Sequence, residues 1–280
     1  MSKHQRTTGK VILAGEHAVV YGKMALVTSI ALGVRVMVVE KGGTEKNPII
    51  DKAIEVAGGD KSIHVEIESE LPIGSGLGSS AAVSAAVILA VREHLVKPID
   101  KDELFNLTFE CEKLAHGNAS GLDPAAVVYG GLLAYTKGQP FERLKINKPI
   151  KLLLVNTGKP AEPTKEMIEL VAQSPDKIEI IEQIANVVKK VKERLVGGEE
   201  IADLIDQNGV LLERLGVVGE RALLLSRELR GLGAKVKIAG AGGVRTGSGM
   251  MLVMHPDFTQ IKKLLDNMQI DYFETIIGDK

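Results

Sequence analysis

The chain has 280 residues, and its 35 Lys and Arg residues against 36 Asp and Glu residues give a formal net charge of −1 at neutral pH. This balance provides no general attraction to nucleic acid or to an anionic membrane. Aromatic residues make up 3% of the chain and Trp is absent, which argues against stacking of single-stranded bases. The 45% hydrophobic content is ordinary for a globular protein, and this length allows a sizeable core.

The sequence contains one cysteine, Cys111, and therefore no intrachain disulfide. No histidine has the spacing to cysteine that a zinc site requires, so any metal should be a hard cation held by oxygen ligands. The first eight residues are polar, and the apolar run from Val11 to Val20 is interrupted by Glu16 and His17. We expect no signal peptide and no membrane span, and hence a cytoplasmic protein.

The residue pattern of the first half predicts strands and helices in a mixed order. Alternating or β-branched runs predict strands over residues 10–14, 24–40, 64–69, 132–136 and 150–155. Apolar residues at helical spacing predict helices over residues 48–58, 81–96, 100–116 and 120–129, with Asp100 as the cap of the third.

The second half is mainly helical. Residues 163–230 follow a helical period with breaks at Ser174-Pro175, Gly197-Gly198 and Gly216. Strands are predicted over 235–239, 250–254 and 272–277, and a helix over 256–268. Strands and helices do not alternate strictly, which predicts an α+β fold. A lobe boundary is expected near Lys145–Pro149, dividing the chain into residues 1–149 and 150–280.

A glycine-rich segment, Pro72-Ile-Gly-Ser-Gly-Leu-Gly-Ser-Ser-Ala-Ala82, connects a strand to a long apolar helix. Its three glycines allow tight turns and close approach of a ligand to the backbone, and Ser79 and Ser80 are the expected N-caps. Because a helix start attracts phosphate, the segment favours a nucleotide ligand; a turn without a ligand is the alternative. It matches neither a Walker A loop nor a dinucleotide-binding fingerprint.

Three further segments carry polar residues at turns or glycine-rich stretches. Gly9–Gly22 places Glu16 and His17 at a strand exit, where side chains commonly line pockets or form a polar turn. Gly117–Asp123 places Asp123 at a helix start among small residues, as a candidate base or a solvated cap. Gly240–Gly249 joins two strands through a glycine-rich loop, which indicates close backbone packing.

These four segments, in this order, resemble those of the GHMP kinases. The sequence Gly-Glu-His-Ala-Val-Val-Tyr-Gly over residues 15–22 is similar to the corresponding motif of the mevalonate kinases within that group. The resemblance covers nearly the whole chain. It implies a two-lobed fold with the active site between the lobes, ATP and mevalonate as substrates, and bound Mg²⁺, with no nucleic-acid or membrane partner. A homodimer is compatible with it.

The resemblance also implies a role for individual residues. Asp123 would be the base beside the attacking hydroxyl, and Lys10 would pair with it and stabilise charge on the transferring phosphoryl group. Ser80 and Glu112 would hold Mg²⁺, and Glu16 and His17 would line the acceptor pocket. ATP would be held by the phosphate loop and a nearby serine, which are Ser69, Gly74, Ser75, Gly76, Leu77, Gly78, Ser79 and Ser80.

The glycine-rich loop of residues 240–249 departs from the family pattern. Val244, Arg245 and Thr246 separate its two glycine clusters and resemble a three-residue insertion. We expect these residues to project outward without blocking ATP. Two alternatives stay open: a GHMP kinase for another hydroxyl acceptor, and a catalytically weak member that senses a nucleotide or metabolite.

Overall fold

The computed structural model describes residues 4–45, 47–72, 74–116 and 120–278. Packing divides the chain into two compact units. Unit 1 contains residues 1–10, 29–72 and 78–130, and unit 2 contains residues 11–28, 73–77 and 131–280. Both units are therefore discontinuous in sequence, and the expected lobe division at residues 149 and 150 stays a prediction.

Long antiparallel strands form the sheet of unit 1. Strands β1 (Gln5–Ala14) and β2 (Ala25–Val39) are neighbours, and both run on into unit 2. The second half of β2 pairs with β3 (His64–Ser69), with Val34 opposite Ser69. β1 begins five residues earlier than predicted, because Thr7 is buried and donates a hydrogen bond to the carbonyl of Ala82 at 2.7 Å.

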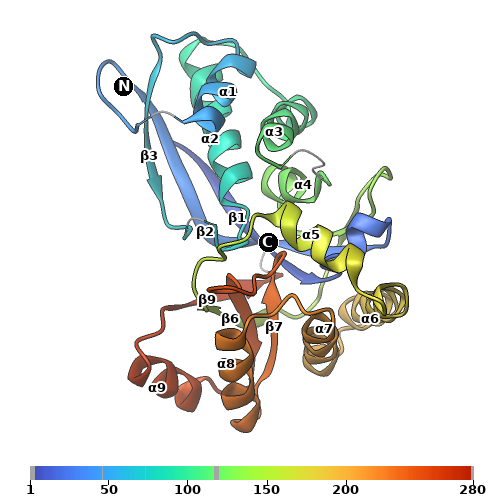
Figure 1. Cartoon of the computed structure of the whole chain (residues 1–280). Coiled ribbons are helices and arrows are strands. Elements are labelled where there is room, and N and C mark those ends of the chain that lie inside the picture. The colour runs from blue at the N-terminus through green and yellow to red at the C-terminus, as the bar shows by residue number, and fades with distance from the viewer. Residues whose placement is uncertain (1–3, 46, 73, 117–119, 279–280) are drawn as a thin grey trace. The chain divides into compact units, whose positions relative to one another are not determined.

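Four helices cover one face of these strands (Figure 1). They are α1 (Pro48–Val56), α2 (Ser79–His94), α3 (Lys101–His116) and α4 (Leu122–Tyr129). Asp100 accepts a hydrogen bond from the Glu103 amide at 2.8 Å, which confirms it as the cap of α3. Helix α2 packs against the other three, and its buried alanines permit that close packing.

Unit 2 contains an antiparallel sheet in the order β7-β8-β6-β9. Its strands are β6 (Ile150–Asn156), β7 (Lys235–Ala239), β8 (Met250–Met254) and β9 (Tyr272–Ile277). The first residues of β2 pair with β4 (Leu132–Tyr135), which pairs with β5 (Glu142–Leu144). The three-residue β5 and the short 3-10 helix η1 (Ala18–Tyr21) were not predicted, because neither is long enough to show a period.

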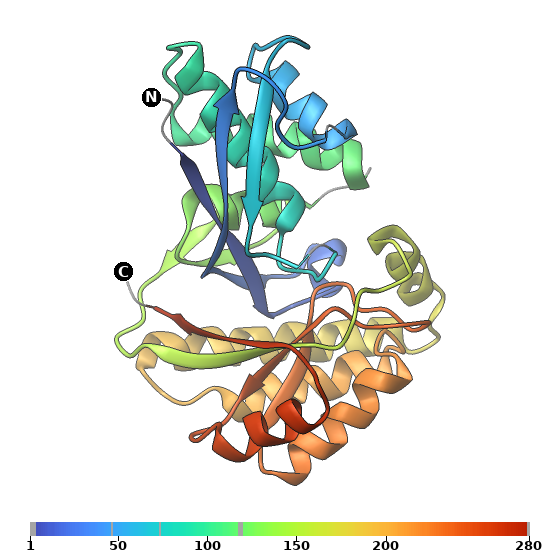
Figure 2. The same cartoon turned by 90° about the vertical axis from the view of Figure 1, so that its left-hand side faces the viewer.

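The helices of unit 2 are α5 (Thr164–Gln173), α6 (Lys177–Gly197), α7 (Ala202–Arg214), α8 (Glu220–Gly231) and α9 (Thr259–Asn267). Helices α7, α8 and α9 lie on the same side of the four-stranded sheet (Figure 2). Gly209 lets α7 approach β7 closely, because a Cβ there would meet the Val236 carbonyl oxygen at 2.2 Å. The predicted breaks between α5, α6, α7 and α8 and the predicted α+β class are confirmed.

Every helix in the described ranges is too short or too polar to cross a lipid bilayer.

Candidate functional site

Lys10 and Asp123 form an ion pair within unit 1. The Nζ atom of Lys10 lies 3.1 Å from Oδ1 of Asp123, with Lys10 at the buried inner part of β1 and Asp123 in the first turn of α4. The Lys10 side chain is 3% exposed and that of Asp123 is 32% exposed. The pair therefore combines a rigidly held cation with a carboxylate that a ligand can reach.

The start of α2 lies against the stem of Lys10. A Cβ at Gly78 would approach Cγ of Lys10 to 2.8 Å, so only glycine allows this packing without displacement of the lysine. Gly78 is the N-cap residue, with a φ of 72°, and Ser79 and Ser80 fall in the first turn. The prediction that Ser79 and Ser80 are N-caps was therefore wrong, because the N-cap is Gly78, one residue before them. Since glycine has no side chain, the first amides of α2 have no side-chain cap.

Ser80 and Glu112 come from adjacent antiparallel helices. Helix α3, which carries Cys111 and Glu112, packs against α2, which carries Ser80. Burial raises the pKa of the Cys111 thiol to about 11. Glu112 is buried, and Oγ of Ser80 is buried without a hydrogen-bond partner among the described residues.

This donor set fits Mg²⁺. A buried hydroxyl without a partner and a buried carboxylate are hard oxygen ligands, and nucleotide phosphates and water usually complete such a site. Within the described ranges no three His, Cys, Asp or Glu side chains form a metal-binding cluster. The arrangement suits a metal that arrives with phosphate.

The first half of the glycine-rich segment, residues 74–77, packs within unit 2. The carbonyl of Ser75 accepts a hydrogen bond from the Met250 amide at 2.9 Å, at the start of β8. A Cβ at Gly76 would lie 2.4 Å from the Ala239 carbonyl oxygen, and one at Gly249 would lie 2.8 Å from that of Ser75. Two glycine-rich loops thus meet by backbone contact, as the sequence of residues 240–249 predicted.

Ser69 lies at the end of β3 and is exposed. Its hydroxyl accepts a hydrogen bond from the Leu71 amide at 3.1 Å, which stabilises the turn that leads into the glycine loop. An ATP contact from Ser69 stays a prediction. Residues 117–119, in the predicted segment before Asp123, lie outside the described residues.

Glu16 and His17 follow β1 in a tight turn of unit 2, and both are buried. Glu16 forms an ion pair with Lys237 of β7, a residue to which the sequence analysis assigned no function. The Nε2 atom of His17 lies 3.0 Å from the Ala241 carbonyl oxygen. Glu16 therefore holds the turn to β7, and His17 holds it to the start of the Gly240–Gly249 loop.

Burial lowers the pKa of His17 to about 4, and the hydrogen bond to Ala241 opposes this shift only in part. The imidazole is therefore neutral at physiological pH. A carbonyl oxygen can only accept a hydrogen bond, so Nε2 carries the proton and Nδ1 presents a lone pair. A group that binds at Nδ1 must donate a proton, as a hydroxyl does and a carboxylate does not.

The three residues of the apparent insertion bind to the chain leading into α5. Glu162 is buried, and its Oε1 accepts hydrogen bonds from the amides of Val244 (3.2 Å) and Arg245 (2.8 Å) and from Nε of Arg245 (3.0 Å). Arg245 also donates to Glu166, while Thr246 donates to the Lys159 carbonyl at 2.8 Å. The Arg245 guanidinium is thus occupied by two carboxylates and stays 57% exposed.

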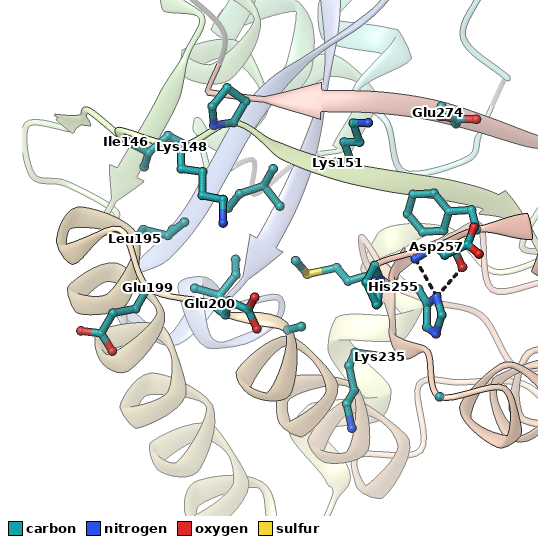
Figure 3. A pocket seen from close by; sticks show the side chains of 18 of the residues that line it. Ile146, Lys148, Lys151, Leu195, Glu199, Glu200, Lys235, His255, Asp257 and Glu274 are labelled. Atoms are coloured by element: carbon teal, nitrogen blue, oxygen red, sulfur yellow. Dashed lines mark hydrogen bonds between the residues drawn. The ribbon is translucent and has the colours of Figure 1, made fainter.

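A cavity of about 680 Å³ lies at the other end of the unit 2 sheet (Figure 3). It is lined by residues from the start of β6 and β7 and the end of β8, including Lys148, Lys235 and His255. His255 is hydrogen-bonded to Asp257. None of the predicted site residues lines this cavity, so its size does not bear on the chemistry predicted from the motifs.

Comparison with known proteins agrees with the family predicted from the sequence motifs. The model for the GHMP kinases N terminal domain matches residues 47–131. The mevalonate kinase of Archaeoglobus fulgidus is 34% identical, over 84% of this chain and 87% of that protein. Human mevalonate kinase is 30% identical, over 96% of this chain and 91% of that protein.

Solved structures show the same fold. That of Methanococcus jannaschii mevalonate kinase aligns with a TM-score of 0.82 at 23% identity, covering 100% of this chain and 99% of that one. The Leishmania major mevalonate kinase in complex with R-mevalonate aligns with a TM-score of 0.81 at 22% identity, covering 98% and 96% of the two chains. From its motifs, fold and relatives, the chain belongs to the GHMP kinase family.

Proposed function

We propose that the chain transfers the γ-phosphoryl group of ATP to the primary hydroxyl of mevalonate, giving 5-phosphomevalonate. The observation that carries the kinase chemistry is the 3.1 Å ion pair between Lys10 and Asp123 beside the open start of α2. The choice of acceptor is supported by the mevalonate kinases among the relatives and by the Gly15-Glu16-His17 turn.

Asp123 is the base in this proposal. Phosphoryl transfer needs positioning, charge stabilisation and one acceptor for the hydroxyl proton. Asp123 is the accessible member of the ion pair, so its carboxylate can accept that proton as the hydroxyl oxygen attacks. Lys10 is fixed by burial, and its ammonium holds Asp123 in place and stabilises negative charge on the transferring group.

The uncapped amides at the start of α2 bind phosphate oxygens, together with the backbone of the loop from Gly74 to Ser80. Ser80 and Glu112 would hold Mg²⁺, which would neutralise charge on the phosphates of ATP. The buried hydroxyl of Ser80, which has no partner among the described residues, supports this assignment.

Glu16 and His17 select the acceptor. A neutral His17 with its proton on Nε2 offers a lone pair on Nδ1, which suits a hydroxyl of the acceptor. Burial of both residues favours discrimination, because an acceptor that fails to pair with a buried polar group loses affinity by about 1–3 kcal/mol.

A coupled assay of ATP consumption tests the proposal, with mevalonate, phosphomevalonate, galactose and homoserine as acceptors. We expect kcat/KM for mevalonate to exceed that for every other acceptor by at least about 10²-fold. Higher activity with another acceptor would show that the chain phosphorylates that acceptor instead of mevalonate. Absence of activity with all four, together with ATP binding, would favour a nucleotide or metabolite sensor.

A further inference from the structure

Lys237 is a fully buried lysine that the predicted chemistry does not use. It lies on β7, its side chain is 0% exposed, and its ammonium donates to the carboxylate of Glu16, which is 1% exposed. The same ammonium donates to the Ile12 carbonyl, at 3.0 Å. Buried charges persist only when they are paired and hydrogen-bonded, so the position of each side chain depends on the other.

Helix α7 holds the same turn from a second direction. The Gly15 amide donates to Oδ1 of Asn208 at 3.3 Å. The next residue, Gly209, allows α7 to lie against the backbone of β7 at Lys237, because a Cβ there would be 3.1 Å from Cβ of the lysine. Two neighbouring positions of one helix therefore fix the turn and make room for the lysine that binds it.

The turn needs this support because its backbone is strained. Gly15 has a φ of 104° and the next but one residue, His17, has a φ of 59°, a region that non-glycine residues seldom occupy. Such conformations persist where surrounding contacts determine them, and they gather at ligand-binding positions. His17 is also held by Ala241, which follows Lys237 on the same segment.

We infer that Lys237 is a positioning residue for acceptor binding, which acts through the carboxylate of Glu16 to hold the turn that presents His17. This inference rests on the proposed function, and it divides the roles of two adjacent residues. His17 contacts the acceptor. Glu16 and Lys237 form an ion pair that holds the turn only when both charges are present. Removal of both charges should therefore raise the acceptor KM less than removal of one.

A double-mutant cycle with Glu16→Gln and Lys237→Met tests this division. Each single variant leaves one buried charge without its partner, so we expect the KM for mevalonate to rise at least about tenfold, with the ATP KM changed less than about twofold. The double variant should have a mevalonate KM at least about threefold below that of Glu16→Gln. Lys235→Met is the matched control, because Lys235 is on the same strand but lines the cavity at the other end of the sheet. The mevalonate KM of the Lys235→Met variant should equal that of the wild type.

The contrary outcomes are equally defined. An unchanged mevalonate KM in Lys237→Met, or a double variant whose KM equals or exceeds that of Glu16→Gln, would overturn the inference, because Glu16 would then bind the acceptor directly. If Lys237→Met does not fold, as judged by thermal unfolding, the comparison of Glu16→Gln with the double variant decides alone. If the wild type prefers another acceptor, the proposed function fails but the cycle is run with the KM for that acceptor.

Discussion

The Nζ atom of Lys10 lies 3.1 Å from Oδ1 of Asp123, and the two residues differ in what surrounds them. Lys10 is enclosed by the sheet and by Gly78 at the start of α2, whereas a third of the Asp123 side chain is open. The lysine side chain is therefore held in place by its surroundings, and the carboxylate of Asp123 is the group that can contact a substrate.

Replacement of Asp123 by Asn should remove the proton acceptor while preserving the shape of the side chain. We expect kcat to fall by about 10²–10⁴-fold, the usual contribution of a positioned base, and the dissociation constant for ATP to change only a few fold. Steady-state kinetics and calorimetric titration with ATP measure the two quantities. A variant that keeps about half of the wild-type kcat would contradict the role of Asp123.

Glu112→Gln should raise the Mg²⁺ concentration needed for half-maximal rate by about tenfold or more, because an amide oxygen is a weaker ligand than a carboxylate. The mevalonate KM should change much less. Ser80→Ala should act in the same direction, while Ser84→Ala on the same helix serves as a control for packing. A Mg²⁺ titration that coincides with that of the wild type would exclude Glu112 as a ligand.

Stability should depend on pH through His17. Its pKa is about 4 in the folded protein and about 6.5 when unfolded, so the unfolded chain binds more protons between these values. The free energy of unfolding should therefore fall as the pH is lowered from about 6.5 to about 4, by roughly 3 kcal/mol in total, and level off below. Urea unfolding at several pH values measures this slope.

His17→Asn is the comparison for that slope, since Asn has no proton to gain in this range and tolerates a positive φ. The variant should lose most of the pH dependence between 4 and 6.5. An unaltered slope would show that another group causes it.

Deletion of Val244–Thr246 alone should destabilise the protein. Burial acts to raise the pKa of Glu162, but the hydrogen bonds from Arg245 and Val244 outweigh it, and the pKa lies below its ordinary value. Deletion of the three residues leaves this carboxylate buried without those donors and should destabilise the protein by about 3–5 kcal/mol. Adding Glu162→Leu to the deletion should restore much of the loss, as measured by chemical unfolding.

Arg245→Ala should be mild in kinetics, because the guanidinium already binds Glu162 and Glu166. We expect kcat and the ATP KM to stay within about threefold of wild type. A tenfold loss of ATP affinity would show instead that Arg245 binds phosphate.

Periodicity predicted most elements because their signals are local. The helical runs of unit 2 and their glycine breaks needed only neighbouring residues. Lys237 could not be predicted, since Lys235-Val-Lys237-Ile reads as a strand with one solvated face, and its partner Glu16 is 221 residues away. The early start of β1 was missed for a related reason: Thr7 is polar, but its hydroxyl is satisfied by a distant carbonyl.

The buried thiol of Cys111 can report the local separation of α2 and α3 in the wild-type chain. A thiol with a pKa of about 11 hardly reacts as thiolate at neutral pH, so alkylation must wait until α2 and α3 separate. Because the sequence holds a single cysteine, each modified molecule records opening at one place, next to Glu112. The rate of iodoacetamide labelling, measured with and without Mg²⁺ and nucleotide, would then follow ligand occupancy with no engineered label.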